Sequence, residues 1–273
     1  MTRIAERLRL AVAELPGEDA RWEAEALLAQ ALGRERAWLY AHADDEVDAA
    51  AEHAFAATLA RRRAGEPLAY VLGRRAFWHM DLVVTPATLV PRPETELLVE
   101  LALARIPQAA ASDVLDLGTG SGAIALAIAL DRPAARVVAL DASADALAVA
   151  RANAQANELD VEFVRSDWFA QLGGRHFDVV IANPPYLADD DPHLQSLRHE
   201  PREALVSGAD GLDAIRRIAA DARAATRTGG WLLLEHGAAQ GAAVRAILEA
   251  NGWESVKTDR DLEGRDRVTS GRR

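Results

Sequence analysis

The tetrapeptide Asn183-Pro184-Pro185-Tyr186, which directly follows an apolar run, has the residue types for a defined chemistry. An Asn side-chain oxygen and a Pro carbonyl oxygen can together accept both hydrogens of a planar –NH2 group. The ring of Tyr186 can cover the flat face of that group, and the prolines stiffen the backbone. An amide or aniline-like nitrogen is a poor nucleophile, so aligning its lone pair with an electrophilic carbon would supply much of the rate. The tetrapeptide therefore predicts transfer of a carbon group to such a nitrogen, with a proline-stiffened turn as the purely structural alternative.

A glycine-rich turn lies upstream, between an expected strand and an expected helix. Its residues are Gly118, Thr119, Gly120, Ser121 and Gly122. Glycines let a ligand approach the backbone closely, and a helix N-terminus offers free N–H groups. Asp141 ends the next expected strand, 21 residues after Gly120, where a carboxylate can accept both hydroxyls of a ribose. The pattern predicts a nucleoside cofactor but not which one, because Gly118, Gly120 and Ala123 also match the dinucleotide spacing of NAD-linked dehydrogenases.

The elements that must position these two segments alternate between strand and helix after Asp113. Strands are expected at 114–117, 137–140, 161–164, 177–182, 231–235, 253–258 and 267–270, and helices at 122–130, 144–157, 213–226 and 238–251. Short apolar strands alternating with helices predict an α/β fold with a mostly parallel sheet covered on both faces. Ligands of such sheets bind beyond the carboxyl ends of the strands, so both segments are expected at one edge.

The first part of the chain has a different pattern. Residues 1–75 show apolar residues at helical spacing and many alanines, which predicts a small all-α bundle. Residues 76–93 are expected to form a β-hairpin linker, and Tyr70-Val71-Leu72 is expected to be extended as part of the same hairpin region. Residues 94–273 are expected to form the cofactor-binding domain, with Pro93 in the first turn of its opening helix.

The composition narrows the classes of function. The chain has 273 residues, 31 of them basic and 42 acidic, with a net charge of −11 and no cysteine. The acidic balance favours a protein or small-molecule substrate over nucleic acid, since phosphate binding usually needs a basic surface. The apolar runs are too short to span a bilayer, and the seven histidines show no metal-ligand spacing. A cytoplasmic enzyme without a metal, a membrane contact or stable nucleic-acid binding is expected.

The glycine turn, Asp141 and the Asn-Pro-Pro-Tyr segment together resemble the amino-group-directed class I methyltransferases. More narrowly, the sequence resembles the bacterial release factor glutamine methyltransferases of the HemK/PrmC family. Segments 91–96, 200–205, 208–212 and 261–268 also match that family. The resemblance extends over the whole chain, including the N-terminal helices, and implies a class I, Rossmann-like methyltransferase domain.

The resemblance implies a donor, a substrate and a set of site residues. The donor is S-adenosylmethionine, and the acceptor is the glutamine side-chain nitrogen of a Gly-Gly-Gln motif in a translation release factor. The glycine turn would hold the methionine part of the donor, Asp141 the ribose, and Trp168 and Asp167 the adenine. Asn183, which also borders the donor, would bind the glutamine together with Pro184, Pro185 and Tyr186.

Other readings remain open from the sequence. A methyltransferase acting on amino groups of adenine or guanine in DNA or RNA would use the same tetrapeptide. A regulatory module that binds a nucleoside cofactor without catalysis would leave the tetrapeptide without a purpose. Glu94 either joins the substrate site or only places an acid at a helix start, and Glu200 and Arg202 are expected to form an ion pair beside the site.

Overall fold

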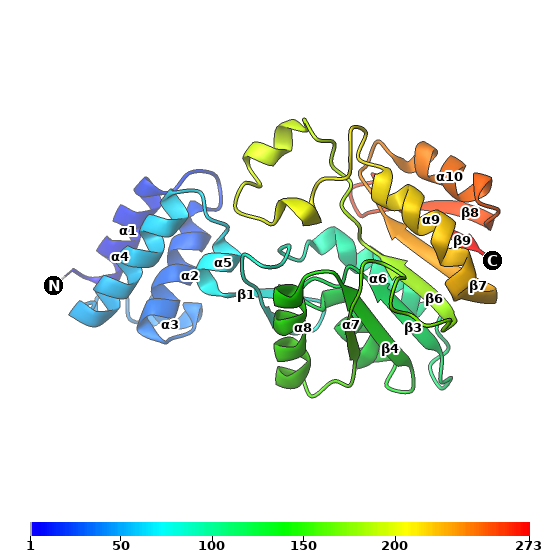
Figure 1. The fold of residues 1–273 in the computed structure, drawn as a ribbon. Helices are drawn as coiled ribbons and strands as arrows, with labels where there is room; N and C mark the ends of the chain where they lie inside the picture. The colour runs from blue at the N-terminus through cyan, green and yellow to red at the C-terminus, as the bar shows by residue number, and fades with distance from the viewer. Residues whose placement is uncertain (1) are drawn as a thin grey trace. The chain divides into compact units, whose positions relative to one another are not determined.

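The computed structural model describes residues 2–273 and divides into two compact units, residues 1–74 and 75–273. Each unit has its own buried core. Among the described residues, no helix is both long and apolar enough to cross a membrane. The two units are drawn in Figure 1.

The described part of the first unit, residues 2–74, contains five helices. They are α1 (Ile4–Glu14), α2 (Ala20–Leu32), α3 (Arg36–Ala41), α4 (Ala49–Arg63) and α5 (Leu68–Leu72). Asp48 caps α4 by accepting the backbone N–H of Ala51 at 2.8 Å, which satisfies one of the free donors of the first turn. Arg62 of α4 binds both carboxylate oxygens of Glu23 of α2, at 2.8 and 2.9 Å. This ion pair joins two helices whose apolar faces, including Leu27 and Phe55, form the core.

The structure shows that Tyr70-Val71-Leu72 is helical and not extended, so that part of the hairpin prediction is wrong. The segment belongs to α5, which starts after Pro67 and ends at Gly73 in the left-handed conformation. Pro67 and Gly73 favour a short helix between them. The side chains of Tyr70 and Val71 are both buried, so the segment lacks the alternating exposure of a half-buried strand.

A hairpin follows, formed by β1 (Arg74–Phe77) and β2 (Met80–Val83). Phe77, Met80 and Leu82 belong to the core of the second unit. The fully buried Asn153 accepts the N–H of Val83 at 2.7 Å and donates to its carbonyl at 2.9 Å. The same amide donates to the carbonyl of Ser121 at 2.8 Å, so one side chain connects the hairpin to the glycine-rich turn.

The second unit is built on a seven-stranded sheet with the order β5-β4-β3-β6-β7-β9-β8. The strands are β3 (Asp113–Leu117), β4 (Arg136–Asp141), β5 (Glu162–Arg165), β6 (Phe177–Ala182), β7 (Thr226–Glu235), β8 (Glu254–Arg260) and β9 (Asp266–Arg272). The strands β5, β4, β3, β6 and β7 are parallel, while β9 runs antiparallel to both β7 and β8. The expected α/β class and mostly parallel sheet are confirmed.

Helices cover both faces of this sheet. They are α6 (Glu96–Leu103), α7 (Ala123–Asp131), α8 (Ala144–Ala156), α9 (Asp213–Ala225) and α10 (Gly241–Ala250), with 3-10 turns η1 (Pro93–Thr95), η2 (Pro192–Gln195) and η3 (Arg202–Ala204). Successive strand residues point to opposite faces, so Val179 and Ile181 pack with α6 and α7, whereas Val180 and Ala182 pack with α9 and α10. Figure 1 shows α9 and α10 on the side of the sheet away from α6 and α7. The sheet is therefore buried on both faces, and its carboxyl edge remains to carry a site.

Candidate active site

The glycine-rich turn joins β3 to α7 at the carboxyl edge of the sheet. Gly118, Gly120 and Gly122 have backbone φ angles of +71°, +56° and +86°, which residues other than glycine rarely adopt. A Cβ on Gly120 would meet no atom within 4 Å, whereas one on Gly122 would lie 3.2 Å from Leu126 and 3.3 Å from Ala150. Gly120 therefore leaves space for a ligand, and Gly122 allows α7 and α8 to pack closely.

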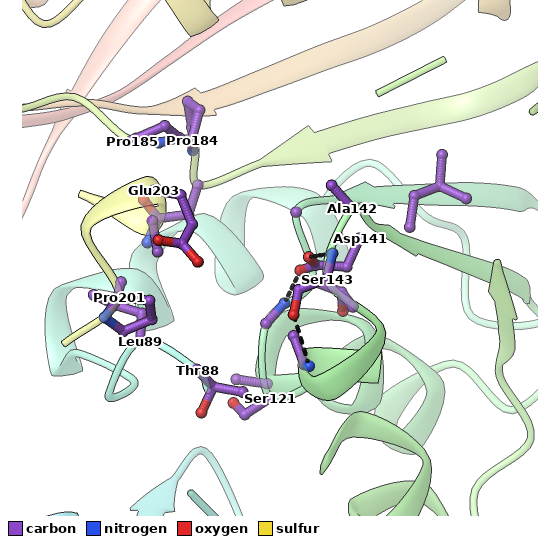
Figure 2. Close-up of a pocket in the computed structure, with 18 of the residues that line it drawn as sticks. Thr88, Leu89, Ser121, Asp141, Ala142, Ser143, Pro184, Pro185, Pro201 and Glu203 are labelled. Atoms are coloured by element: carbon purple, nitrogen blue, oxygen red, sulfur yellow. Dashed lines mark hydrogen bonds between the residues drawn. The ribbon is translucent and has the colours of Figure 1, made fainter. Parts of the chain in front are cut away.

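Asp141 ends β4 beside the turn, where the sequence placed it. Its Oδ2 accepts the backbone N–H of Gly120 at 2.9 Å, and its Oδ1 accepts that of Ser143 at 2.9 Å (Figure 2). These bonds fix the carboxylate and connect the turn to the start of α8. Because each carboxylate oxygen can accept more than one hydrogen bond, acceptor positions remain for the hydroxyls of a ligand.

A second carboxyl group, that of Asp116, lies buried beneath the turn. The hydroxyl of Thr119 donates to Asp116 Oδ2 at 2.7 Å, while Oδ1 makes no hydrogen bond. Burial raises the pKa of Asp116 to about 7, against the lowering effect of the Thr119 hydrogen bond. No role for Asp116 was predictable from the sequence, because an acid within a strand gives no sign of its burial.

Trp168 follows β5 and has a positive φ of 48°. The hydroxyl of Ser166 donates to the Trp168 carbonyl at 2.7 Å and accepts the N–H of Gln171 at 3.1 Å. These bonds stabilise the unusual backbone conformation. The Trp168 ring comes within 3.8 Å of where a Cβ on Gly118 would lie, so an aromatic face borders the glycine-rich turn.

Asp167 also borders the cavity, but its carboxylate has a partner. Both oxygens bind the guanidinium of Arg217 of α9, at 3.0 and 2.9 Å. Both side chains are substantially exposed, so the pair is screened by solvent. A contact between this carboxylate and an adenine amino group would share the carboxylate with Arg217.

The Asn-Pro-Pro-Tyr segment follows β6, which lies between β3 and β7. The side-chain nitrogen Nδ2 of Asn183 donates to Thr95 Oγ1 at 3.3 Å. That bond engages the nitrogen side of the amide, so the oxygen Oδ1 remains as an acceptor. Asn183, Pro184 and Pro185 all line the cavity, as a device that binds a planar –NH2 group requires.

Tyr186 is held through its backbone. Its carbonyl accepts a hydrogen bond from Gln240 Nε2 at 3.0 Å. A Cβ on Gly211 would lie only 2.2 Å from that carbonyl oxygen, so glycine is required there. Burial, and then the negative charge of Glu235, raises the pKa of the Tyr186 phenol to about 12. The phenol is therefore protonated at neutral pH and does not serve as a base.

One cavity, of about 230 Å³, brings the expected site residues together. Gly118, Thr119, Gly120, Ser121, Asp141, Asp167, Trp168, Asn183, Pro184 and Pro185 line it. Figure 2 shows Pro201 and Glu203 across the cavity from Asp141 and Ser143. Gly122, Tyr186 and Glu94 are outside this lining, although the negative charge of Glu94 raises the pKa of both Tyr186 and Glu235. The structure therefore brings most of the expected site residues to one cavity and leaves these three outside its lining.

The opposite wall of the cavity has no residue whose role was predicted from the sequence. It is formed by Ala87, Thr88, Leu89, Pro91, Arg92, Thr95, Pro201, Glu203 and Ala204. Buried Glu200 holds its two segments together by accepting the N–H of Val90 at 3.0 Å and pairing with Arg92. The expected ion pair between Glu200 and Arg202 is wrong, because Glu200 faces the interior while the exposed Arg202 side chain lies 4.0 Å from Asp189. Only the match of both segments to one family pointed to their importance.

Comparison with known proteins identifies the family. Residues 94–209 match the methyltransferase small domain, and residues 5–73 match the PrmC N-terminal domain. The release factor glutamine methyltransferase of Xylella fastidiosa is 54% identical over 255 residues, covering 92% of this chain and 93% of that protein. The chain belongs to the release factor glutamine methyltransferase family. The protein of the same name from Pseudomonas aeruginosa is 50% identical, with 92% of each chain covered.

A solved methyltransferase from Pyrococcus furiosus shares the fold. It has a TM-score of 0.54 and 19% identity, and the match covers 77% of this chain and 94% of that one. Membership of the family makes the chain an S-adenosylmethionine-dependent methyltransferase, and its fold is one that a methyltransferase adopts.

The geometry of Asp141 leads to a prediction about cofactor binding. Asp141→Ala should weaken S-adenosylmethionine binding by about 100-fold, because hydrogen bonds to a charged acceptor contribute about 1.5–3 kcal/mol each. The same change also frees the N–H of Gly120. Isothermal titration calorimetry measures the affinity, and Asp145→Ala in the exposed first turn of α8 is the matched control. Equal affinities for native protein and Asp141→Ala would contradict the ribose assignment.

Proposed function

We propose that the chain transfers a methyl group from S-adenosylmethionine to the side-chain amide nitrogen of the glutamine in the Gly-Gly-Gln motif of translation release factors. One observation carries this proposal: the glycine-rich turn and the Asn-Pro-Pro segment line the same cavity. Membership of the family supports the choice of substrate. Action on release factors would place the enzyme in the cytoplasm.

The residues around the cavity fit S-adenosylmethionine. The backbone at Gly118 and Gly120 would hold the methionine part, where added side chains are excluded by φ. Asp141 would accept the ribose hydroxyls, and the Trp168 ring would cover the adenine. The neighbouring Asp167 would contact the adenine amino group while remaining bound to Arg217. The donor, when bound, supplies an electrophilic methyl group.

The Asn-Pro-Pro-Tyr segment would bind and orient the glutamine. Asn183 Oδ1 and the Pro184 carbonyl would accept the two amide hydrogens, so that the nitrogen lone pair faces the methyl group. As the C–S bond of the donor breaks and the N–C bond forms, these acceptors would stabilise the positive charge on the nitrogen more strongly than in the ground state. One of the two amide protons would then be lost to water, which yields the neutral N-methyl amide and the demethylated donor. Pro185 lines the pocket, and the ring of Tyr186 would cover the flat face of the amide. Because the Tyr186 phenol stays protonated, it does not accept an amide hydrogen. Asn183 and Pro184 are therefore the groups that act directly on the amide hydrogens.

We propose a protein substrate in preference to nucleic acid because the chain carries a net charge of −11. A nucleic-acid substrate would need cationic contacts to phosphates, and a paired base would have to be flipped out of its stack. A glutamine in an exposed Gly-Gly-Gln loop has no stacked partner to leave. Methylation of adenine or guanine is the alternative outcome of the assay below.

The first test is methyl transfer from radiolabelled S-adenosylmethionine. A folded release factor should be labelled, and its variant with alanine in place of the target glutamine should not be. Short DNA and RNA of mixed sequence serve as competing acceptors under the same conditions. Label in DNA or RNA, with none in the release factor, would replace the proposed substrate by a nucleic acid.

Asn183→Ala should separate chemistry from donor binding. We expect kcat to fall by about 100-fold, the usual loss when a preorganised stabilising group is removed, because Asn183 Oδ1 would hold the reacting amide. The affinity for S-adenosylmethionine should change by less than about threefold, within about 0.7 kcal/mol. Asn157→Ala, at the C-terminus of α8, removes an amide outside the cavity and should leave kcat within about twofold. A large loss of donor affinity in Asn183→Ala, with kcat preserved, would disprove the assigned role.

We further propose that the N-terminal helices provide a surface for the release factor. The unit has its own core, and Leu10, Trp22 and Tyr40 are 46%, 44% and 59% exposed. Exposed aromatic side chains are enriched at protein interfaces. This unit matches the PrmC N-terminal domain.

Removal of residues 1–74 tests this role. The remaining chain contains every residue that lines the cavity, so it should bind S-adenosylmethionine with nearly native affinity. It should methylate the release factor at least about tenfold less efficiently, through a higher KM, because remote contacts contribute to kcat/KM. Native kcat/KM in the truncated enzyme would limit the N-terminal unit to a structural role.

A further inference from the structure

Glu235, a residue without an assigned role, lies directly behind the proposed glutamine site. It ends β7, and the pairing of Ala182 with Leu234 in the parallel β6–β7 ladder brings Glu235 level with Asn183. Its side chain is 1% exposed, and its Oε2 makes no hydrogen bond. A buried carboxylate is costly unless its oxygens are satisfied, so its presence next to the site calls for a functional reason.

A short chain of polar groups connects Glu235 to Asn183. The Oγ1 atom of Thr95, a residue that is 4% exposed, accepts a hydrogen bond from Asn183 Nδ2 at 3.3 Å. Hydrogen bonding from the Thr95 hydroxyl, and to a smaller extent from the Asn183 amide, lowers the pKa of Glu235 against the effect of burial. Asn183 and Thr95 line the cavity, whereas Glu235 is outside it. Glu235 can therefore act on a substrate only through these two residues.

The direction of hydrogen bonding along this chain depends on the charge of Glu235. A carboxylate only accepts, whereas a protonated carboxyl group can also donate. When Glu235 is ionised, the single Thr95 hydroxyl proton is drawn to the carboxylate, and the Thr95 oxygen is left to accept from Asn183 Nδ2. When Glu235 is protonated, it can donate to Thr95, whose proton can then bind Asn183 Oδ1. In that second arrangement the Asn183 amide turns its nitrogen toward the cavity.

We propose that ionised Glu235 is a positioning residue that fixes the side-chain amide of Asn183, through Thr95, with its oxygen toward the substrate amide. The inference rests on the proposed function, since it matters only if the substrate presents an –NH2 group. If the Asn183 amide is turned so that its nitrogen faces the cavity, its N–H groups meet the N–H groups of the substrate amide. One of the two hydrogen bonds that hold the glutamine is then lost. Glu235 thus selects the reactive orientation without touching the substrate.

The proposal implies a defined pH dependence. Burial raises the pKa of Glu235 to about 7, the Thr95 hydrogen bond and the charge of Arg267 lower it, and Glu94 raises it. The Tyr186 phenol, which also faces this group, stays neutral because its pKa is about 12. Since the ionised form is the active one, kcat should fall as the pH decreases through about 7. Burial also raises the pKa of Asp116 to about 7, but Asp116 is unchanged in Glu235 variants, so a pH dependence that is lost in Glu235→Gln belongs to Glu235.

The experiment compares Glu235→Gln, Asn183→Ala and the double variant. Glu235→Gln keeps the shape but can present either an acceptor or a donor to Thr95, so kcat at about pH 8 should fall about tenfold, or about 1.4 kcal/mol. In Glu235→Gln, kcat should no longer fall as the pH decreases through about 7, and the affinity for S-adenosylmethionine should be unchanged. In the Asn183→Ala background, Glu235→Gln should change kcat by less than about twofold, because the group it positions is already absent. Thr95→Val should reproduce the loss, and Thr95→Ser should recover most of it.

Thermal unfolding gives a readout independent of activity. The folded-state pKa of Glu235 lies above the ordinary carboxyl value, so the native state binds the extra proton and its stability falls as the pH rises from about 4.5 to about 7. Glu235→Gln should therefore raise Tm at about pH 8, and the gain should shrink at about pH 5. Thr269→Val, which removes another buried hydroxyl bonded to His236 at 2.8 Å, is the control and should lower Tm without affecting kcat.

The NMR signals of the Asn183 side-chain amide report its orientation directly. At about pH 8 they should be sharp in the native protein and broadened or shifted in Glu235→Gln. Three results would overturn the inference: unchanged kcat in Glu235→Gln, an equal loss in both Asn183 backgrounds, or a parallel loss of Tm and kcat. Absence of release factor methylation by the native enzyme would instead remove the proposed function, and the NMR comparison would still test how Glu235 orients Asn183.

Discussion

The parallel pairing of β4, β3, β6 and β7 is the constraint on which the site depends. The four strands end at the same edge. Asp141 and Glu235 are the last residues of β4 and β7, while the glycine-rich turn directly follows β3 and Asn183 directly follows β6. Residues far apart in the sequence are therefore neighbours, because the register of strand pairing places the strand ends side by side. A shift of one residue in the β6–β7 register would turn Glu235 to the other face of the sheet, away from Asn183.

Features with a local cause were predictable from the sequence. The glycine-rich turn and Asp141 carry their signal within a few residues of a strand end, and the alternation of apolar strands with helices fixed the fold class. The hairpin region was only partly predictable, since the Tyr70 to Leu72 segment has residues typical of strands but is set between a proline and a left-handed glycine. Capping outweighed residue preference there.

Features that depend on distant contacts were not predictable. The wall opposite Asp141 exists because Glu200 binds the backbone of Val90, 110 residues earlier, and no spacing rule relates the two. The same limit applies to Asp116 and Glu235, because burial, and not residue type, sets their unusual pKa values. The predicted ion-pair partner of Glu200 was Arg202, its neighbour in the sequence, whereas the actual partner is Arg92.

Asn153 gives the molecule a mechanical property. Its amide binds both the N–H and the carbonyl of Val83, and also the carbonyl of Ser121, so a shift of the hairpin would pull on the glycine-rich turn. Linked equilibria are reciprocal: a partner that tightens the hairpin would raise donor affinity, and a bound donor would stiffen the hairpin by the same free energy. With the donor bound at the glycine-rich turn as proposed, a single buried side chain would transmit its occupancy to a hairpin strand that does not line the cavity.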